Sequence, residues 1–117
     1  MLRFWRATLN SRNGLAFAFR SERAFREEVV ALALALPLAS LIGTTGMRRV
    51  ELIAVVVLLI VVELLNTAIE KLADRVTTDH DPQIGRVKDV GSAAVGVALV
   101  MAGMFWLFAI AERIGAI

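Results

Sequence analysis

The sequence predicts an all-α integral membrane protein, and two observations support this class. Hydrophobic residues make up 58% of the 117 residues while 21% are charged, so the charges must be separated from long apolar runs. Residues 52–62 and 90–111 are two such runs without any charge. One soluble domain of this length could not bury so much apolar surface, so a bilayer is the expected solvent. Cysteine is absent, which excludes disulfides and thiolate metal sites.

A single membrane domain is expected, which begins with a surface helix over residues 1–21. Leu2, Trp5 and Leu9 recur there at helical spacing with arginines between them, a pattern typical of an amphipathic helix in the headgroup region. The first transmembrane helix is expected over residues 24–43. It is the weakest of the spans, because its uncharged part is short and contains Pro37.

Two stronger spans follow, over residues 52–72 and 90–111. The third span has 22 residues and no charge. At about 1.5 Å per residue it crosses roughly 30 Å of hydrocarbon unaided. The sequence therefore predicts three transmembrane helices plus one surface helix.

The positions of lysine and arginine predict the orientation. Ten of the 13 lie before the first span or between the second and third, and three lie on the other side. The positive-inside rule then puts the N-terminus and the second connection in the cytoplasm. Net charge is only +2, because most acids lie on that same side, so nucleic acid is not expected as a partner.

A polar stripe follows the apolar run of the second span. Glu63, Glu70 and Asp74 fall within about 40° of one another around a helix, and Asn66 lies about 60° to one side. An ionisable group at membrane depth costs roughly 2.5–3.5 kcal/mol, so such groups persist mainly where they line a cavity, bind an ion or face a partner. The stripe is therefore the candidate active site.

The chemistry expected at this stripe is carboxylate chemistry, because neither of the standard glycine-rich phosphate loops occurs. Glu70, near the cytoplasmic end, could reach a hydrated Mg²⁺, and Glu22 could complete its shell. Glu63 lies two turns deeper, where a lipid hydroxyl could meet it as a general base. Lys88 and Ser92 open the third span one turn apart and could supply phosphate contacts on a facing surface.

Three blocks carry a resemblance to a known family. They are Glu-x-x-Asn-x-x-x-Glu at residues 63–70, Lys-Asp-x-x-Ser at residues 88–92, and Glu-Arg-Ala-Phe-Arg-Glu at residues 22–27. With them the chain resembles, over nearly its whole length, the small bacterial integral-membrane diacylglycerol kinases. The resemblance implies a homotrimer in the cytoplasmic (inner) membrane, ATP with Mg²⁺ as phosphoryl donor, diacylglycerol as substrate and phosphatidic acid as product.

The resemblance also implies residue roles. Glu63 would be the catalytic base, Glu22 and Glu70 the metal carboxylates, and Asn66 and Asp74 essential polar support. His80 has no catalytic role in this interpretation, although its loop would contact the nucleotide. The implied nucleotide contacts are Arg3, Asn10, Glu22, Glu70, Asp79, His80, Asp81, Lys88 and Asp89.

The implied lipid contacts come from several elements. Glu27 departs from the family, since a glutamine stands there in familiar diacylglycerol kinases, and a carboxylate replaces a neutral donor. The implied substrate residues are Arg3, residues 7–12, Ala24, Phe25, Arg26, Glu27, Glu28, Glu63, Ser92 and Trp106.

A site shared between protomers is expected, because three helices of one chain cannot enclose the stripe well. Small residues at the start of the third span would let backbones approach closely, and Ser92 and Gly96 form a small-xxx-small pair.

Two other functions remain open from the sequence. The nearer is undecaprenol kinase, a sister activity that resembles this family throughout. The other is a small oligomeric proton or cation conductor with Glu63 as the relay, although a relay needs neither a second carboxylate nor the Lys88–Asp89 pair.

Overall fold

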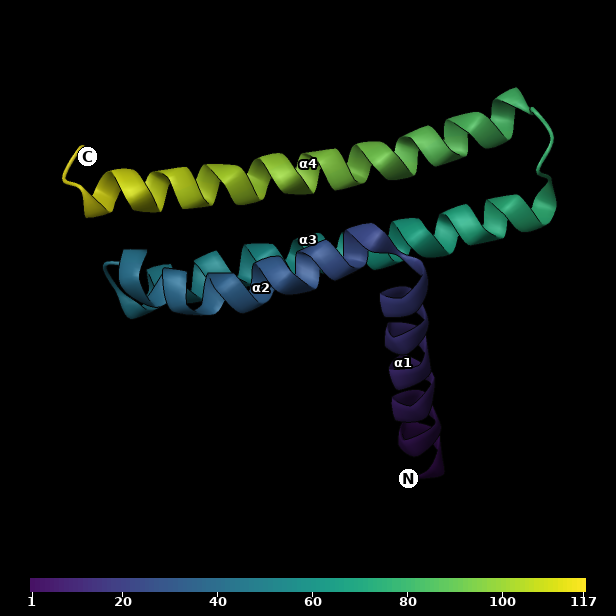
Figure 1. The fold of residues 1–117 in the computed structure, drawn as a ribbon, viewed down its shortest axis with the longest axis horizontal. Coiled ribbons are helices and arrows are strands. Elements are labelled where there is room, and N and C mark those ends of the chain that lie inside the picture. The colour runs from purple at the N-terminus through teal and green to yellow at the C-terminus, as the bar shows by residue number, and fades with distance from the viewer.

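The computed structural model describes all 117 residues, which form four α-helices and no strand (Figure 1). The helices are α1 (Leu2–Ser21), α2 (Arg23–Ile42), α3 (Gly46–Val76) and α4 (Pro82–Arg113). α3 packs against both α2 and α4 in an elongated bundle, and α1 projects away from it (Figure 1). The predicted all-α class is confirmed.

Two helices, α3 and α4, are long and apolar enough to cross a membrane. They contain 31 and 32 residues and extend beyond the spans predicted at 52–72 and 90–111. α2 has 20 residues and does not meet the same criterion, because Arg26, Glu27 and Glu28 lie in its first two turns. Only 17 of the 117 residues are buried, so lipid or another chain must cover the apolar surface of the bundle.

Side-chain caps define where the two long helices begin. Thr45 Oγ1 accepts a hydrogen bond from the Arg48 amide at 3.0 Å, which starts α3. Asp81 Oδ1 accepts from the amides of Gln83 and Ile84, with Pro82 at the first helical position of α4. These caps fix the short α2–α3 and α3–α4 connections and so align the three bundle helices.

Small residues mediate the contact of α4 with the bundle. The buried residues of α4 are Gly91, Ala98, Ala102 and Ala109, spaced seven, four and seven apart along one face. Ser92 and Gly96, the small pair expected to pack between protomers, are exposed in the single chain. The rotation of α4 about its axis turns the Gly91 stripe inward, and the neighbouring small residues are left for contacts outside this chain.

A polar cluster closes the bundle at the end opposite the polar stripe. Arg48 Nε donates to Glu112 Oε1 at 3.1 Å and its Nη1 donates to Glu51 Oε2 at 2.5 Å. Thr44 Oγ1 donates to Glu112 Oε1 at 2.8 Å, and the Arg48 guanidinium lies 4.7 Å from the centre of the Phe108 ring. The hydrogen bonds from Arg48, and then from Thr44, lower the pKa of the Glu112 carboxyl.

Because the folded state lowers the pKa of Glu112, this cluster should stabilise the protein above the ordinary glutamate pKa and lose that effect as pH falls through the lowered value. We expect Glu112→Gln to lower the Tm by a few degrees near pH 7. The difference from the unmodified protein should shrink below about pH 4. Thermal unfolding in detergent at several pH values measures this. Arg113→Gln is the control, since Arg113 forms no ion pair, and a gap that persists at low pH would contradict the expectation.

Candidate active site

Three neighbouring polar side chains of α3 are buried within this apolar helix. Glu63 and Asn66 are each 8% exposed and Thr67 is 6% exposed. Asn66 Nδ2 donates a hydrogen bond to Glu70 Oε1 at 3.1 Å. This bond holds the Glu70 carboxylate one turn from Asn66, on the same face as Glu63. Glu63 and Asn66 of the expected stripe thus face the inside of the bundle, Glu70 is half-buried and Asp74 is exposed.

Gly91 of α4 allows the closest approach to this stripe. A Cβ atom at Gly91 would collide with Oδ1 of Asn66. The same Oδ1 atom is buried and has no hydrogen-bond partner. The backbone of α4 therefore lies directly against Asn66, and any side chain larger than that of glycine would force Asn66 to shift.

Gly91→Ala should destabilise the protein by about 1–3 kcal/mol, because the added methyl group forces Asn66 from its position. It should also lower activity, since Asn66 orients Glu70. Gly103→Ala is the matched control on the same helix: nothing lies within 4 Å of a Cβ there. Chemical unfolding in detergent and initial rates measure both effects. Equal stability of the two variants would show that Asn66 moves aside without cost.

Glu22 approaches the stripe from the elbow between α1 and α2. It ends α1 and begins α2 with φ −116° and ψ 111°, and its side chain caps neither helix. Its carboxylate instead forms an ion pair with Lys71, with Oε1 3.2 Å from Nζ. Glu22 and Glu70 both lie near enough to Glu63 for their charges to repel it. Acids from two parts of the chain therefore lie within electrostatic reach of Glu63.

A fourth acid, Glu28, joins this group from the second turn of α2. Glu63 repels its carboxylate, and its Oε1 atom is buried without a hydrogen-bond partner. Glu27, one residue earlier, is turned outward and pairs with Arg23 at 2.9 Å. Of the two neighbouring glutamates, only Glu28 belongs to the acidic cluster.

The other residues at the start of α2 have structural partners. Phe25 is buried. Arg26 Nη1 donates to the carbonyls of Phe19 and Arg20 at 2.8 and 3.0 Å, and so satisfies the end of α1. Ala24 is exposed. Ala24, Phe25 and Arg26, three of the predicted lipid contacts, lie in the first turn of α2. This turn mainly fixes the elbow between α1 and α2.

An ion pair between α3 and α4 marks the end of the stripe nearest the α3–α4 connection. Lys88 Nζ donates to Asp74 Oδ1 at 2.5 Å. The two residues therefore face each other, one turn beyond Glu70. Asp89 is exposed and has no polar side-chain partner. Lys88 is held at the edge of the acidic cluster, where an incoming phosphate would meet it.

Several predicted site residues lie apart from this cluster. Asp79 and His80 are exposed in the loop, where Asp81 caps α4. Arg3 and Asn10 lie on α1, about 28 and 18 Å along its axis from Glu22 at 1.5 Å per residue.

Two predicted lipid contacts on α4 also lie apart. Ser92 is exposed, although it is next to Gly91. Trp106 Nε1 donates to the Leu52 carbonyl at 3.2 Å in the buried packing near the opposite end of the bundle. Leu52 is 11 residues from Glu63, about 16 Å along α3. In this chain Trp106 therefore stabilises the bundle and does not reach the candidate site.

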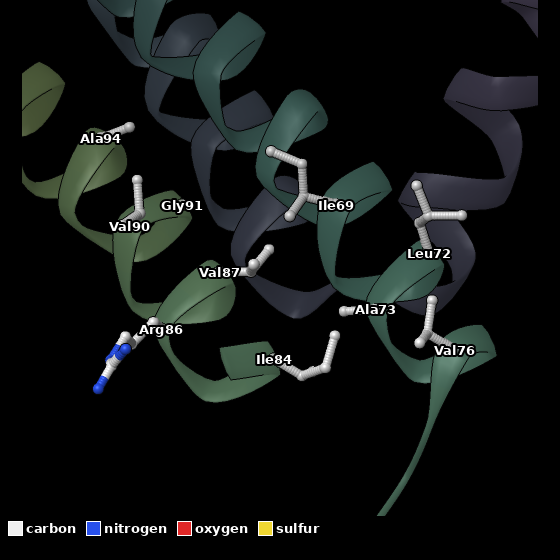
Figure 2. Close-up of a pocket in the computed structure, with 10 residues that line it drawn as sticks. All are labelled: Ile69, Leu72, Ala73, Val76, Ile84, Arg86, Val87, Val90, Gly91 and Ala94. Atoms are coloured by element: carbon white, nitrogen blue, oxygen red, sulfur yellow. The ribbon is translucent and has the colours of Figure 1, made fainter. Parts of the chain in front are cut away.

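The largest groove does not coincide with the acids. It has a volume of about 610 Å³ and lies between α3 and α4 (Figure 2). Its lining is apolar, with Ile69 and Val76 on α3 and Val87 on α4, and the Arg86 side chain points away from α3 (Figure 2). The groove runs beside the polar stripe at Gly91, and no proposed catalytic residue lines it.

The donor set fits a magnesium ion bound together with a substrate phosphate. No group of three or more acidic, histidine or cysteine side chains is arranged to hold a metal by itself. Mg²⁺ commonly takes only one or two carboxylates plus phosphate oxygens and water. Glu70, held by Asn66, and Glu22, free of any capping bond, are oxygen donors of that kind.

Two residues of this region had no predicted site role. Lys71 counted in the sequence only toward topology, although it directly follows Glu70, and Gly91 counted only as one of several small residues. Their roles depend on how α3 meets the α1–α2 elbow and on how α4 is rotated. The sequence feature that could have identified Lys71 as a site residue was its position directly after Glu70, a candidate metal ligand.

Two membrane-length helices with a buried glutamate and further acids nearby are typical of a membrane protein with a functional site among its helices. Comparison with known proteins agrees with this class. The sequence profile of the prokaryotic diacylglycerol kinase family matches residues 9–110. The chain belongs to this family, and it is an enzyme of the diacylglycerol kinase type.

Relatives from three genera support this membership. The diacylglycerol kinase of Escherichia coli K12 is 40% identical over 102 residues, which is 87% of this chain and 84% of that protein. The diacylglycerol kinase of Pseudomonas aeruginosa is 41% identical over 104 residues, 89% of this chain and 85% of its own length. That of Haemophilus influenzae is 39% identical over 100 residues, covering 86% and 85%.

Proposed function

We propose that this diacylglycerol kinase transfers the γ-phosphoryl group of ATP to the free hydroxyl of diacylglycerol and forms phosphatidic acid at the cytoplasmic membrane surface. The main structural support is the convergence of Glu22, Glu63 and Glu70 beside Asn66. The names of the related proteins support diacylglycerol over undecaprenol as the acceptor. Membership of an enzyme family argues against the conductor hypothesis.

The proposed topology has three spans, with α2 as the first. α3 and α4 meet the length and composition of a span. α2 runs beside α3 over its uncharged part and so shares its depth. α1 leaves the bundle at the level of the elbow and would lie on the cytoplasmic surface (Figure 1). The excess of lysine and arginine at this end of the bundle supports a cytoplasmic N-terminus and site.

In the proposed reaction, Glu63 accepts the proton of the lipid hydroxyl. The hydroxyl oxygen at the same time forms a bond to the γ-phosphorus of ATP, and ADP leaves. Glu63 is only 8% exposed, so little water reaches it to compete as an acceptor. Glu22 and Glu70 would hold Mg²⁺, which neutralises charge on the phosphates when bound. Lys88 would bind a phosphate oxygen, with Asp74 holding its ammonium in place. Asn66 orients Glu70.

A direct test offers diacylglycerol and undecaprenol in parallel to the detergent-solubilised protein, with ATP and with or without Mg²⁺. We expect Mg²⁺-dependent transfer to diacylglycerol. Transfer mainly to undecaprenol would move the protein to the sister activity with the same residues, and transfer to neither would contradict the proposal.

We also propose a homotrimer, in which α1 of one protomer completes the site of another. Arg3 and Asn10, proposed nucleotide contacts, are carried by α1 away from the acids of their own chain (Figure 1). The exposed small pair Ser92 and Gly96 offers a close-packing surface to a second copy. A shared site was expected from the sequence. We propose that Glu22 and Glu63 act within one chain, because the Glu22 charge already acts on Glu63 of the same chain.

Mixed oligomers test which residues act between chains. We expect no recovery when inactive Glu63→Gln and Glu22→Gln chains are mixed, because both residues serve the same site of one chain. Mixing Glu63→Gln with Asn10→Ala should restore part of the activity, since some sites then combine an intact bundle with an intact α1 from a neighbour. Initial rates after joint refolding measure this. Recovery in the first mixture but not in the second would reverse the assignment.

A further inference from the structure

Lys71 is the cation in contact with a candidate metal carboxylate. Its Nζ lies 3.2 Å from Glu22 Oε1, and 6.0 Å from the centre of the Phe17 ring. The other four ion pairs lie within α2, at the far end of the bundle, or between Lys88 and Asp74. The Lys71–Glu22 pair is thus the single ion pair between the α1–α2 elbow and α3.

Glu22 has no other side-chain partner. Its side chain caps neither α1 nor α2, although it occupies the position between them. Lys71 is half exposed, with 53% of its side chain accessible, so water and salt weaken the pair. Lys71 therefore holds the Glu22 carboxylate in a weak ion pair. A cation that binds Glu22 more strongly can displace the lysine.

A metal ion at Glu22 and Glu70 would meet the same negative field that attracts Lys71. Glu22 and Glu70 both repel Glu63, so the cluster carries an excess of negative charge. A lysine ammonium offsets part of that excess. A divalent cation beside the same Glu22 carboxylate would repel the ammonium, because two cations would then share one anionic partner.

The structure provides a place for the displaced ammonium. A groove of about 520 Å³ lies between α1 and α3, and its lining includes Lys71, Leu15, Phe17 and Thr67. The groove leaves room for the lysine stem to swing away from Glu22. The Phe17 ring already lies beside the ammonium and can continue to attract it through a cation–π contact.

We propose that Lys71 is a positioning residue which occupies Glu22 in the metal-free enzyme and is displaced when the metal binds, so that it weakens the affinity for the divalent cation. This inference rests on the proposed metal role of Glu22 and Glu70. The ion pair keeps the acidic cluster partly neutralised between turnovers and makes the binding of the metal, and with it of Mg-ATP, readily reversible.

Mn²⁺ binding measured by electron paramagnetic resonance tests the proposal without turnover. The full-length, detergent-solubilised protein is titrated with Mn²⁺ at a fixed concentration of a non-hydrolysable ATP analogue. Lys71→Met should lower the Kd for Mn²⁺ by about two- to fivefold, the range of a partly exposed ion pair. Lys71→Arg should keep the original Kd, because arginine restores the pair with Glu22. The Mg²⁺ concentration for half-maximal activity should fall in parallel in Lys71→Met.

Arg75→Met is the matched control, because it removes one positive charge from the same end of α3 at a residue without an ion pair. Its Kd should stay unchanged. An unchanged or higher Kd in Lys71→Met, or an equal decrease in Arg75→Met, would overturn the proposal. Glu70→Gln separates this failure from a wrong metal site. If Glu70→Gln binds Mn²⁺ normally, the proposed site itself is wrong and the inference falls with it. If binding is lost there while Lys71→Met is unaffected, only the role of Lys71 is wrong.

Discussion

Replacement of Glu63 by glutamine should lower the rate of phosphoryl transfer by about 10²–10⁴-fold, the usual contribution of a general base. Glutamine has nearly the same shape, so the packing around the buried side chain is kept. It cannot take the proton of the lipid hydroxyl, and the chemical step is therefore lost. Mg-ATP binding should remain nearly intact, because the proposed metal carboxylates are Glu22 and Glu70.

Initial rates with diacylglycerol and calorimetric titration with a non-hydrolysable ATP analogue separate these two effects. Glu51→Gln is a suitable control, since Glu51 lies on the same helix but in the Arg48 cluster at the opposite end. Its activity should be close to that of the unmodified protein. Loss of nucleotide binding in Glu63→Gln would assign Glu63 to the nucleotide site, and retained activity would exclude it as the base.

The helices of this protein follow from local properties of the sequence. Unbroken apolar runs are a feature of a single segment, and together with the composition they were sufficient for the all-α class. The polar stripe could be predicted as well, because Glu63, Asn66 and Glu70 share a helix face through the period of 3.6 residues. These predictions needed no knowledge of neighbouring helices.

The remaining features depend on how helices meet. Periodicity does not state which small residues of α4 turn inward, and the packed stripe contains Gly91 while Ser92 faces outward. The pairing of Glu22 with Lys71 arises only when the α1–α2 elbow meets α3. Arg26, expected to contact lipid, donates hydrogen bonds to the carbonyls that end α1. That these carbonyls need a donor becomes visible only once the elbow is formed.

Glu70→Gln should have a different effect from Glu63→Gln, because it alters the proposed metal site and leaves the base in place. The glutamine carbonyl can still accept the hydrogen bond from Asn66 Nδ2, so the stripe should keep its packing. It lacks the charge that a hard divalent cation requires. We expect the Mg²⁺ concentration for half-maximal activity to rise tenfold or more, or Mg-ATP binding to be lost.

Rates measured over a range of Mg²⁺ at fixed ATP test this expectation, and the two variants serve as controls for each other. In Glu63→Gln the residual activity should keep the original Mg²⁺ dependence, whereas in Glu70→Gln that dependence should shift. Both residues are acids on one face of α3, so a general effect of removing negative charge would change both curves alike. An unchanged Mg²⁺ requirement in Glu70→Gln would remove Glu70 from the metal shell. Glu28, whose carboxylate also interacts with Glu63, would then be the next candidate to hold the metal together with Glu22.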